Sequence, residues 1–212
     1  MKTITILIRT HKGREKLLKR LMDSIARQTY KDIKIIMSYE EDEFLFSTIM
    51  QYDNVHSIRV FPQREKGDTF YNLYCNDLKE KVDSGWYAIV DSDDHFASDD
   101  ALEKIAPYLN ENKCRAVICQ MSRGNGKIKP TDEMIDNEQI ISGKIGMPCI
   151  FVHHTLKNKV DFTEYDAADY LYIKAISEIA KTTFVKQIVI HSPIRLNGQS
   201  WMIGDTNFSI CK

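Results

Sequence analysis

The sequence is poor in the features that mark membrane-spanning, fibrous and low-complexity proteins. Its 212 residues include only 5 prolines, 9 glycines and 2 tryptophans, and they form no internal repeat or biased linker. No run approaches the roughly 18–20 apolar residues of a membrane-spanning helix. The first apolar segment, Ile4 to Ile8, lies between Lys2 and Arg9 and is too short for a signal peptide. We therefore expect a cytoplasmic protein with no membrane span.

Cysteine usage and charge balance argue against two further classes of protein. The cysteines are odd in number and form no CxxC pair, which indicates reduced thiols rather than a disulfide framework or a zinc site. The 29 basic and 30 acidic residues leave a formal net charge of -1, so charge does not predict binding to nucleic acid or to a membrane surface. We expect no nucleic-acid partner. The cysteines are Cys75, Cys114, Cys119, Cys149 and Cys211.

Helical and strand-like apolar patterns alternate along most of the chain. Leu17, Leu18, Leu21 and Ile25, for example, share one face of a helix. This alternation predicts a single α/β domain with a mostly parallel central sheet and helices on both faces, and 43% hydrophobic residues suffice for a full core. The predicted strands are 3–9, 33–38, 55–61, 86–90, 115–121 and 184–190, and the predicted helices are 14–28, 43–51, 68–82, 99–110 and 167–180.

The pattern weakens between the last two predicted strands. Residues 122–147 are rich in turn-forming glycine, proline and asparagine, which predicts loop structure and is compatible with an edge hairpin. Residues 148–153 are compatible with a short strand. The tail, residues 195–212, has no periodicity from which to predict structure.

The most informative segment is the acidic end of strand 86–90. Asp91, Asp93 and Asp94 follow an apolar run, at the strand end where open α/β sheets place their ligands. Like charges this close are costly unless a cation or a proton offsets them, and oxygen ligands suit Mg²⁺ or Mn²⁺ beside a phosphate. The alternative is an acidic loop before the next helix, since Ser98 is a plausible N-cap followed by two acids.

Several segments together resemble one enzyme family. They are Ile4-Thr5-Ile6-Leu7-Ile8-Arg9-Thr10-His11, residues 21–32 with Ser24 and Gln28-Thr29-Tyr30, and Val90-Asp91-Ser92-Asp93-Asp94. They resemble family 2 glycosyltransferases, where a strand ends in a Pro-Thr-Tyr-Asn-type turn, a helix ends in Ser-xxx-Gln-Thr-Tyr, and a strand closes in Asp-x-Asp-Asp. Asp169-Tyr170-Leu171 and residues 195–200 resemble later motifs of that family.

The resemblance implies a single Rossmann-like GT-A domain. Residues 1–121 would bind the nucleotide sugar, and residues 122–212 would bind the acceptor and form the tail. The implied activity is metal-dependent transfer of a sugar from a nucleotide-diphosphate donor, favouring a UDP-sugar, to a carbohydrate or other hydroxyl acceptor. Mn²⁺ or Mg²⁺ would be the cofactor. We expect inversion at the sugar carbon, because one base and one displacement need no second carboxylate, although sequence alone also allows retention.

Roles for individual residues follow from the resemblance and from the chemistry of transfer. Asp93 is the expected metal ligand, and Asp91 is expected to bind the metal or a ribose or sugar hydroxyl. GT-A enzymes sometimes supply a late histidine to the metal, for which His191 is the candidate. The acceptor hydroxyl must lose a proton. Asp169 is the candidate base, with Asp166 as the alternative.

The same two aspartates also allow a structural interpretation. Asp166 is a plausible N-cap and Asp169 would then lie at N3, where acids stabilise the start of a helix.

Further candidates would contact the donor. Thr10 and Arg14 lie in the first strand-to-helix turn, where backbone N–H groups and a guanidinium can hold phosphate, although Arg14 also fits a solvated basic helix start. Glu40 lies near the position of the family's base-reading aspartate. Asn72 and Asn76 share a helix face, so they could contact the donor or bond to neighbouring backbone.

The sequence departs from the family pattern at several positions. Arg9 replaces the usual proline, Lys12 replaces an asparagine, and Ser38-Tyr39-Glu40 replaces the strand end that carries the base-reading aspartate. Ala168 and Asn197 replace a glutamate and a late histidine. Three alternatives therefore stay open: a non-catalytic protein that binds sugar nucleotides, a nucleotidyltransferase, and a phosphohydrolase of the haloacid-dehalogenase type.

Overall fold

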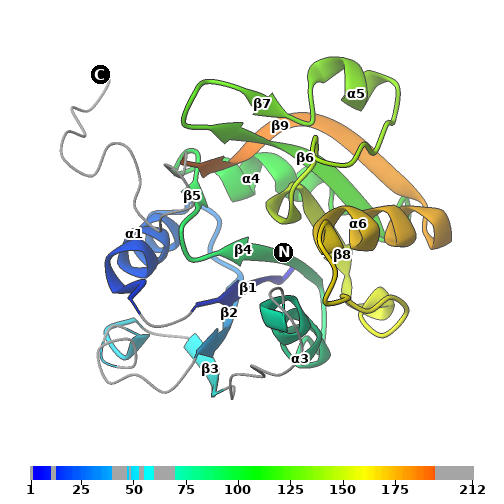
Figure 1. The fold of residues 1–212 in the computed structure, drawn as a ribbon. Helices are drawn as coiled ribbons and strands as arrows, with labels where there is room; N and C mark the ends of the chain where they lie inside the picture. Colours follow the sequence, from blue (N-terminus) through cyan, green and yellow to red (C-terminus); the bar gives the residue numbers. More distant parts are fainter. Residues whose placement is uncertain are drawn as a thin grey trace.

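The first half of the chain alternates strands and helices, as the sequence pattern predicts (Figure 1). The computed structural model describes residues 2–10, 13–39, 47, 49–52, 55–59 and 70–193. Most of the helix predicted at 43–51 lies outside these residues. The elements are β1 (Ile4–Arg9), α1 (Glu15–Ala26), β2 (Ile33–Tyr39), β3 (Val55–Arg59), α3 (Tyr74–Glu80, preceded by a 3₁₀ turn at Phe70–Leu73) and β4 (Trp86–Asp91).

The second half adds five strands and three α-helices within the described residues. The edge hairpin and the short strand that the sequence allowed are both present, as β6 with β7 and as β8. The elements are β5 (His95–Phe96), α4 (Ala101–Ile105), β6 (Ala116–Arg123), β7 (Ile128–Lys129), α5 (Asp132–Asp136), β8 (Ile150–His153), α6 (Ala168–Ile179) and β9 (Thr182–Ser192).

The described strands form one mixed sheet in the order β3-β2-β1-β4-β8-β6-β9-β5, with β7 paired to β6. The strands from β3 to β4 run parallel, and so do β6 and β9. β8 runs antiparallel to both of its neighbours, β4 and β6. The predicted α/β class is confirmed. The sheet is mixed rather than purely parallel because β8 runs antiparallel between the two groups of parallel strands.

The core lies along the two central strands, β1 and β4, and along α1, the helix that follows β1. Residues 86–90 of β4 are all buried, as expected for a central strand covered on both faces. The predicted apolar face of α1 is confirmed, because Leu17, Leu18, Leu21 and Ile25 are each at most 8% exposed. No helix within the described part of the chain has the length and apolar character needed to cross a membrane.

The helix predicted at 99–110 differs from the structure at both ends. α4 begins at Ala101 with Asp100 as its cap residue, and the Ser98 hydroxyl donates to Asp100 Oδ1 at 2.6 Å instead of capping the helix. The helix predicted to continue to residue 110 changes to a 3₁₀ turn at Ala106–Tyr108, because Pro107 has no backbone N–H for the α-helical ladder.

α5 was not predicted, although its start carries a recognisable signal. Thr131 Oγ1 accepts a hydrogen bond from the Met134 backbone N–H at 3.3 Å, so Thr131 is the N-cap. Asp132 and Glu133 follow in the first turn, where acids complement the helix dipole. The helix is only five residues long, which is too short for a periodic apolar pattern to reveal.

The sheet opens where β4 ends. β4 pairs with β8 only through Trp86 and Tyr87, so the last four residues of β4 have no partner on that side within the described ladder. A 3₁₀ turn at Met147–Cys149 precedes β8. The carboxyl end of β4 therefore borders a gap in the sheet rather than a continuous ladder.

Gly85 fixes the start of β4 against the start of β1. Its φ is +70°, in the left-handed region, and an added Cβ would lie 2.2 Å from the carbonyl oxygen of Thr3. That carbonyl accepts a hydrogen bond from Trp86 N at 3.0 Å. Only glycine meets both requirements at this position.

We expect Gly85→Ala to lower the free energy of unfolding by roughly 2–5 kcal/mol, the sum of left-handed strain and overpacking against backbone. Gly126→Ala is the matched control, because Gly126 has a φ of +76° and nothing within 4 Å of its added Cβ. It should cost only about 1–2 kcal/mol. Urea denaturation measures both, and equal losses would contradict the role of the Thr3 contact.

Candidate active site

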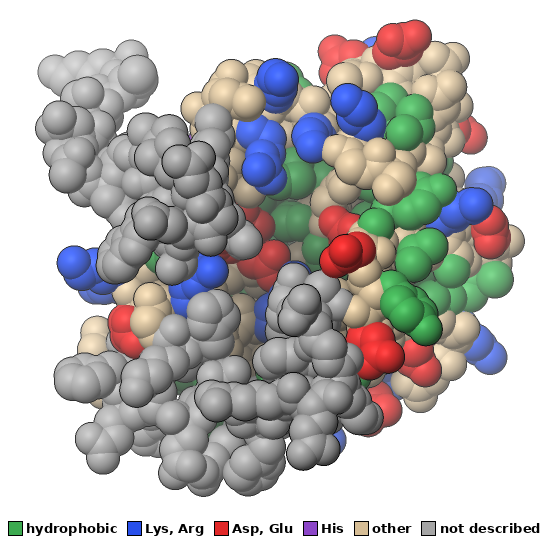
Figure 2. Space-filling model, viewed as in Figure 1, with side chains coloured by type: hydrophobic (Ala, Val, Ile, Leu, Met, Phe, Trp, Pro, Cys, Tyr) green, Lys and Arg blue, Asp and Glu red, His purple; other side chains and the backbone are tan. Residues whose placement is uncertain are grey.

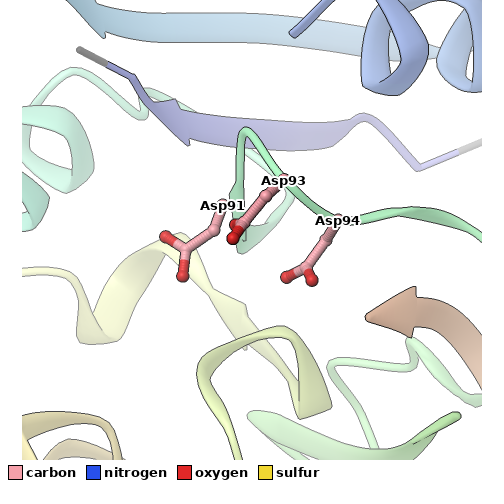
Figure 3. Close-up of side chains that lie close together, drawn as sticks. All are labelled: Asp91, Asp93 and Asp94. Carbon is pink, nitrogen blue, oxygen red and sulfur yellow. The ribbon is translucent and has the colours of Figure 1, made fainter. Parts of the chain in front are cut away.

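Three carboxylates meet in the turn that follows β4. Asp91, Asp93 and Asp94 each place a carboxylate oxygen within 4.8 Å of the others, and Figure 3 shows the three side chains on the same side of the turn. Asp93 and Asp94 are buried, at 5% and 4% exposure. The Asp94 N–H donates to the Asp91 carbonyl at 2.9 Å, which closes the turn. The predicted acidic cluster is therefore built by local backbone geometry.

Arginines from the first strand and helix surround this cluster. Arg9 lies beside Asp91 in the β1–β4 register, and its Nε and Nη2 donate to the two carboxylate oxygens at 2.6 and 3.2 Å. Arg14 Nη1 lies 3.3 Å from Asp93 Oδ2, and Arg20 Nη2 donates to the Asp93 carbonyl at 2.8 Å. Part of the repulsion among the acids is thus offset by the chain itself.

A cavity of about 440 Å³ adjoins the acidic turn. Figure 2 shows a hollow with acidic side chains in it and Lys and Arg side chains gathered above it. The cavity is lined by the carboxyl ends of β1 and β4, the β6–β7 hairpin, residues 143–148, the start of α6 and the end of β9. The polar and charged residues in its lining are Arg9, Asn72, Asp91, Asp93, Asp94, Arg123, Lys129, Asp166, Asp169 and Ser192.

The two candidate bases both line this cavity, but in different environments. Asp169 is the second residue of α6 and half-buried, whereas Asp166 is exposed. Burial raises the pKa of the Asp169 carboxyl above its usual range, and the negative charge of Asp91 raises it further. Asp169 thus lines the same cavity as the acidic turn and lies within electrostatic range of Asp91.

The predicted capping role of Asp166 is wrong. The cap residue of α6 is Ala167, whose φ of 61° places it in the left-handed region and which makes no side-chain capping bond. Asp169 consequently lies one position earlier in the helix than the capping interpretation assumed. The physical reason is the turn at Ala167, which directs Asp166 to the cavity instead of to the helix N–H groups.

Buried contacts hold α6 against the strand that carries the acids. Tyr87 of β4 and Tyr172 of α6 share a hydroxyl–hydroxyl hydrogen bond of 2.7 Å. The Tyr172 ring also stacks on Phe162, with centroids 3.9 Å apart. The position of Asp169 relative to Asp91 is therefore set by packed side chains and not by a loop.

α3 is tied to the segment that precedes α6. Lys79, 1% exposed, donates from Nζ to the carbonyls of Lys157 and Val160 and to Asp161 Oδ1, at 2.6, 2.8 and 2.6 Å. Asn76 bonds to both the N–H and the carbonyl of Phe162, so it has the backbone-bonding role that the sequence left open. Sequence reasoning missed Lys79, because nothing local marks a lysine with partners 78 residues or more away.

Three of the remaining predicted residues are Asn72, Thr10 and Glu40. Asn72 Oδ1 accepts from Arg9 Nη1 at 2.7 Å and lines the cavity. Thr10 is buried, its N–H extends the β1–β2 ladder by donating to Ser38 O at 3.1 Å, and its Oγ1 has no partner among the described residues. Glu40 lies outside the described residues.

His191 is not part of the cavity lining or of the acidic cluster within the described residues. Its Nδ1 hydrogen bonds with Ser122 Oγ at 2.8 Å, and its ring lies 5.0 Å from that of His95. Burial lowers the pKa of His191, and the positive charge of Arg20 lowers it further. The structure therefore brings Asp91, Asp93 and Asp169 together around one cavity and leaves His191 outside that group.

Comparison with known proteins identifies a family and a set of solved structures with this fold. The sequence matches the family described as glycosyl transferase family 2 over residues 5–163. No curated protein matches the chain.

Three solved structures illustrate the likeness, which at such low identity concerns the fold. S. aureus TarS is 14% identical with a TM-score of 0.70, covering 91% of this chain and 37% of its own. TarS 1–349 in complex with UDP-GlcNAc gives 15% and 0.71, covering 92% and 59%. The mannosyltransferase PcManGT from Pyrobaculum calidifontis in complex with GDP-Man and Mn2+ gives 14% and 0.69, covering 93% and 58%. The chain thus spans about 37–59% of these proteins' lengths.

The Arg9–Asp91 pair predicts a measurable coupling. A double-mutant cycle with Arg9→Met, Asp91→Asn and the double variant should give a coupling of roughly 1–3 kcal/mol in the free energy of unfolding, because both side chains are largely buried. The same cycle on the exposed pair of Arg27 and Asp99, 3.1 Å apart, should give about 0–1 kcal/mol. A coupling at the Arg9 pair no larger than the control's would show that the pair is not an internal counter-charge.

Proposed function

The chain belongs to glycosyl transferase family 2, and from this premise we propose that it moves a sugar from a nucleotide-diphosphate donor to an acceptor hydroxyl with the help of a divalent cation. The observation that carries the proposal is the cavity that Asp91, Asp93 and Asp169 line together. A leaving diphosphate needs positive charge, and an attacking hydroxyl needs a base. The cavity has groups for both tasks on opposite sides.

The donor set at the acidic turn fits a hard cation. Asp91, Asp93 and Asp94 offer carboxylate oxygens only, which suits Mg²⁺ or Mn²⁺ and no soft metal. We assign Asp93 as the principal ligand, because both oxygens of Asp91 already accept from Arg9. When bound, the cation neutralises charge that develops on the diphosphate. We do not assign His191 as a ligand, because it lies outside both the acidic cluster and the cavity lining among the described residues.

The donor would lie over the carboxyl ends of β1 and β4. Asp91 then faces the ribose or sugar hydroxyls, and Arg14 lies within reach of a diphosphate beside Asp93. The TarS 1–349 structures contain UDP or UDP-GlcNAc, whereas PcManGT contains GDP-Man and Mn2+. On this support we propose a UDP-sugar donor, bound by residues 1–121, with the acceptor bound by residues 122–212 and with Glu40 near the base.

Asp169 is the proposed general base. In the transfer, the acceptor oxygen forms a bond to the sugar carbon as the bond to the diphosphate oxygen breaks, the diphosphate leaves with the electron pair, and the acceptor proton passes to Asp169. A raised pKa suits this task, because a stronger base accepts the proton more readily. A single displacement from the side opposite the leaving group inverts the sugar carbon.

We predict that UDP-sugars with Mn²⁺ raise the melting temperature of the protein more than UDP-sugars with EDTA, because ligands that bind the native state stabilise it. Asp93→Asn should remove the Mn²⁺-dependent part of the shift and the Mn²⁺-dependent hydrolysis of the donor. Asp99→Asn is the control, since Asp99 is an exposed acid paired with Arg27. Stabilisation by GDP-sugars alone would overturn the UDP assignment, and none by any sugar nucleotide would overturn the proposed function.

Asp169→Asn should lower turnover by roughly 10²–10⁴-fold, the usual contribution of a positioned base, while leaving the donor affinity almost unchanged. In the wild type, activity should fall as the pH drops through the raised pKa of Asp169, above the ordinary aspartate range, because the protonated carboxyl cannot accept a proton. Asp166→Asn is the comparison. An inactive Asp166→Asn enzyme with normal turnover in Asp169→Asn, or a product of retained configuration, would contradict this assignment.

A further inference from the structure

Four basic side chains lie at or near the cavity wall that the β6–β7 hairpin and residues 143–148 form, and two of them line the cavity. We call Arg123, Lys127, Lys129 and Lys144 the basic wall. Arg123 ends β6, Lys127 and Lys129 follow it in the β6–β7 hairpin, and Lys144 lies in the segment after α5. Arg123 and Lys129 line the cavity, and Figure 2 shows Lys and Arg side chains above the hollow.

The basic wall has no carboxylate partner within the described residues. Lys129 Nζ donates to the Gly143 carbonyl at 2.6 Å and Arg123 Nη1 to Ser192 Oγ at 3.3 Å, so both bonds are to neutral groups. Burial lowers the pKa of Lys129, and the charges of Arg123, Lys144 and Lys127 lower it further. Several exposed basic residues elsewhere do have acids beside them, namely Arg27 with Asp99, Lys104 with Asp100 and Lys186 with Asp136.

The basic wall lies close to the chemistry. Burial raises the pKa of the Cys149 thiol to about 12, and the charges that act on this thiol are those of Asp94, Asp169 and Lys129. Cys149 ends the 3₁₀ turn at the base of the cavity. The Cys149 thiol therefore lies within electrostatic range of the acidic turn, the proposed base and Lys129, and Asp94, Asp169 and Lys129 all line the same cavity.

We propose that the acceptor is anionic, with a phosphate or carboxylate close to the hydroxyl that receives the sugar. This inference rests on the proposed function. A negative group bound by Arg123 and Lys129 would relieve the repulsion within the basic wall, since charge-assisted hydrogen bonds to phosphate or carboxylate are the strong ones. The donor diphosphate would have counter-charges of its own, in Arg14 beside Asp93 and in the proposed cation. The basic wall therefore serves the second substrate.

The test is equilibrium binding of matched probes to the full chain with UDP and Mn²⁺ present. A carboxylate-bearing oligogalacturonide, a glycerol phosphate oligomer and an uncharged galactan oligomer of equal length separate the two anion chemistries from a neutral sugar. We expect at least one anionic probe to bind roughly 10–100-fold more tightly than the galactan, with an affinity that falls as salt rises.

The variant Arg123→Gln/Lys129→Gln should lose most of that preference, while Lys113→Gln/Lys159→Gln, which removes the same charge from exposed positions elsewhere, should keep it. Equal binding of the three probes, or equal behaviour of the two variants, would overturn the inference. So would a loss of UDP affinity in the Arg123→Gln/Lys129→Gln variant, because the basic wall would then serve the donor. If no sugar nucleotide binds with Mn²⁺, the proposed function fails instead, whatever the probes show.

Discussion

Mutual repulsion of three aspartates is the constraint around which this fold is arranged. Asp91, Asp93 and Asp94 lie within 4.8 Å of one another, two of them buried, and like charges at such distances need compensation. Arg9 supplies it from the neighbouring strand, and Arg14 and Arg20 supply it from the start of α1 and its first turns. The β1–β4 register thus has an electrostatic consequence as well as a structural one: it sets a guanidinium beside Asp91 at the strand ends. This explains why an arginine stands at position 9, where the family usually has a proline: Arg9 donates hydrogen bonds to both Asp91 and Asn72.

On the proposed function, the acidic turn needs a base held at a fixed place in the same cavity. α6 supplies Asp169, and buried side chains hold this helix on two sides. Tyr172 joins it to β4, while Lys79 and Asn76 of α3 hold the segment before it. A lysine that is 1% exposed is costly to bury, and three oxygen acceptors offset that cost. The result is a site whose two sides come from parts of the chain about 80 residues apart yet are joined through packed contacts.

Local patterns were enough to predict α1, the acidic turn and six strands, β1 to β4, β6 and β9, because apolar periodicity and strand-end acids are visible within a few residues. They missed β5, whose two residues are too few to show a pattern. They also placed Asp169 near the start of a helix. They could not show that Arg9 pairs with Asp91, since that depends on a register between strands 82 residues apart. For the same reason, local patterns could not show that β8 inserts between β4 and β6. Asp166 was misjudged for a local reason, the left-handed turn at Ala167, which no preference of alanine announces.

The hydroxyl pair of Tyr87 and Tyr172 has a consequence for how such an enzyme can diversify. It fastens the helix that carries Asp169 to the strand that carries the acids. Three residues of the basic wall instead belong to the β6–β7 hairpin, whose turn glycine, Gly126, has nothing within 4 Å of an added Cβ. Evolution can therefore lengthen, shorten or recharge that hairpin without moving the reacting groups. On the proposed function, the reacting groups and the surface that binds the acceptor would thus belong to separate parts of the chain, each free to vary without the other.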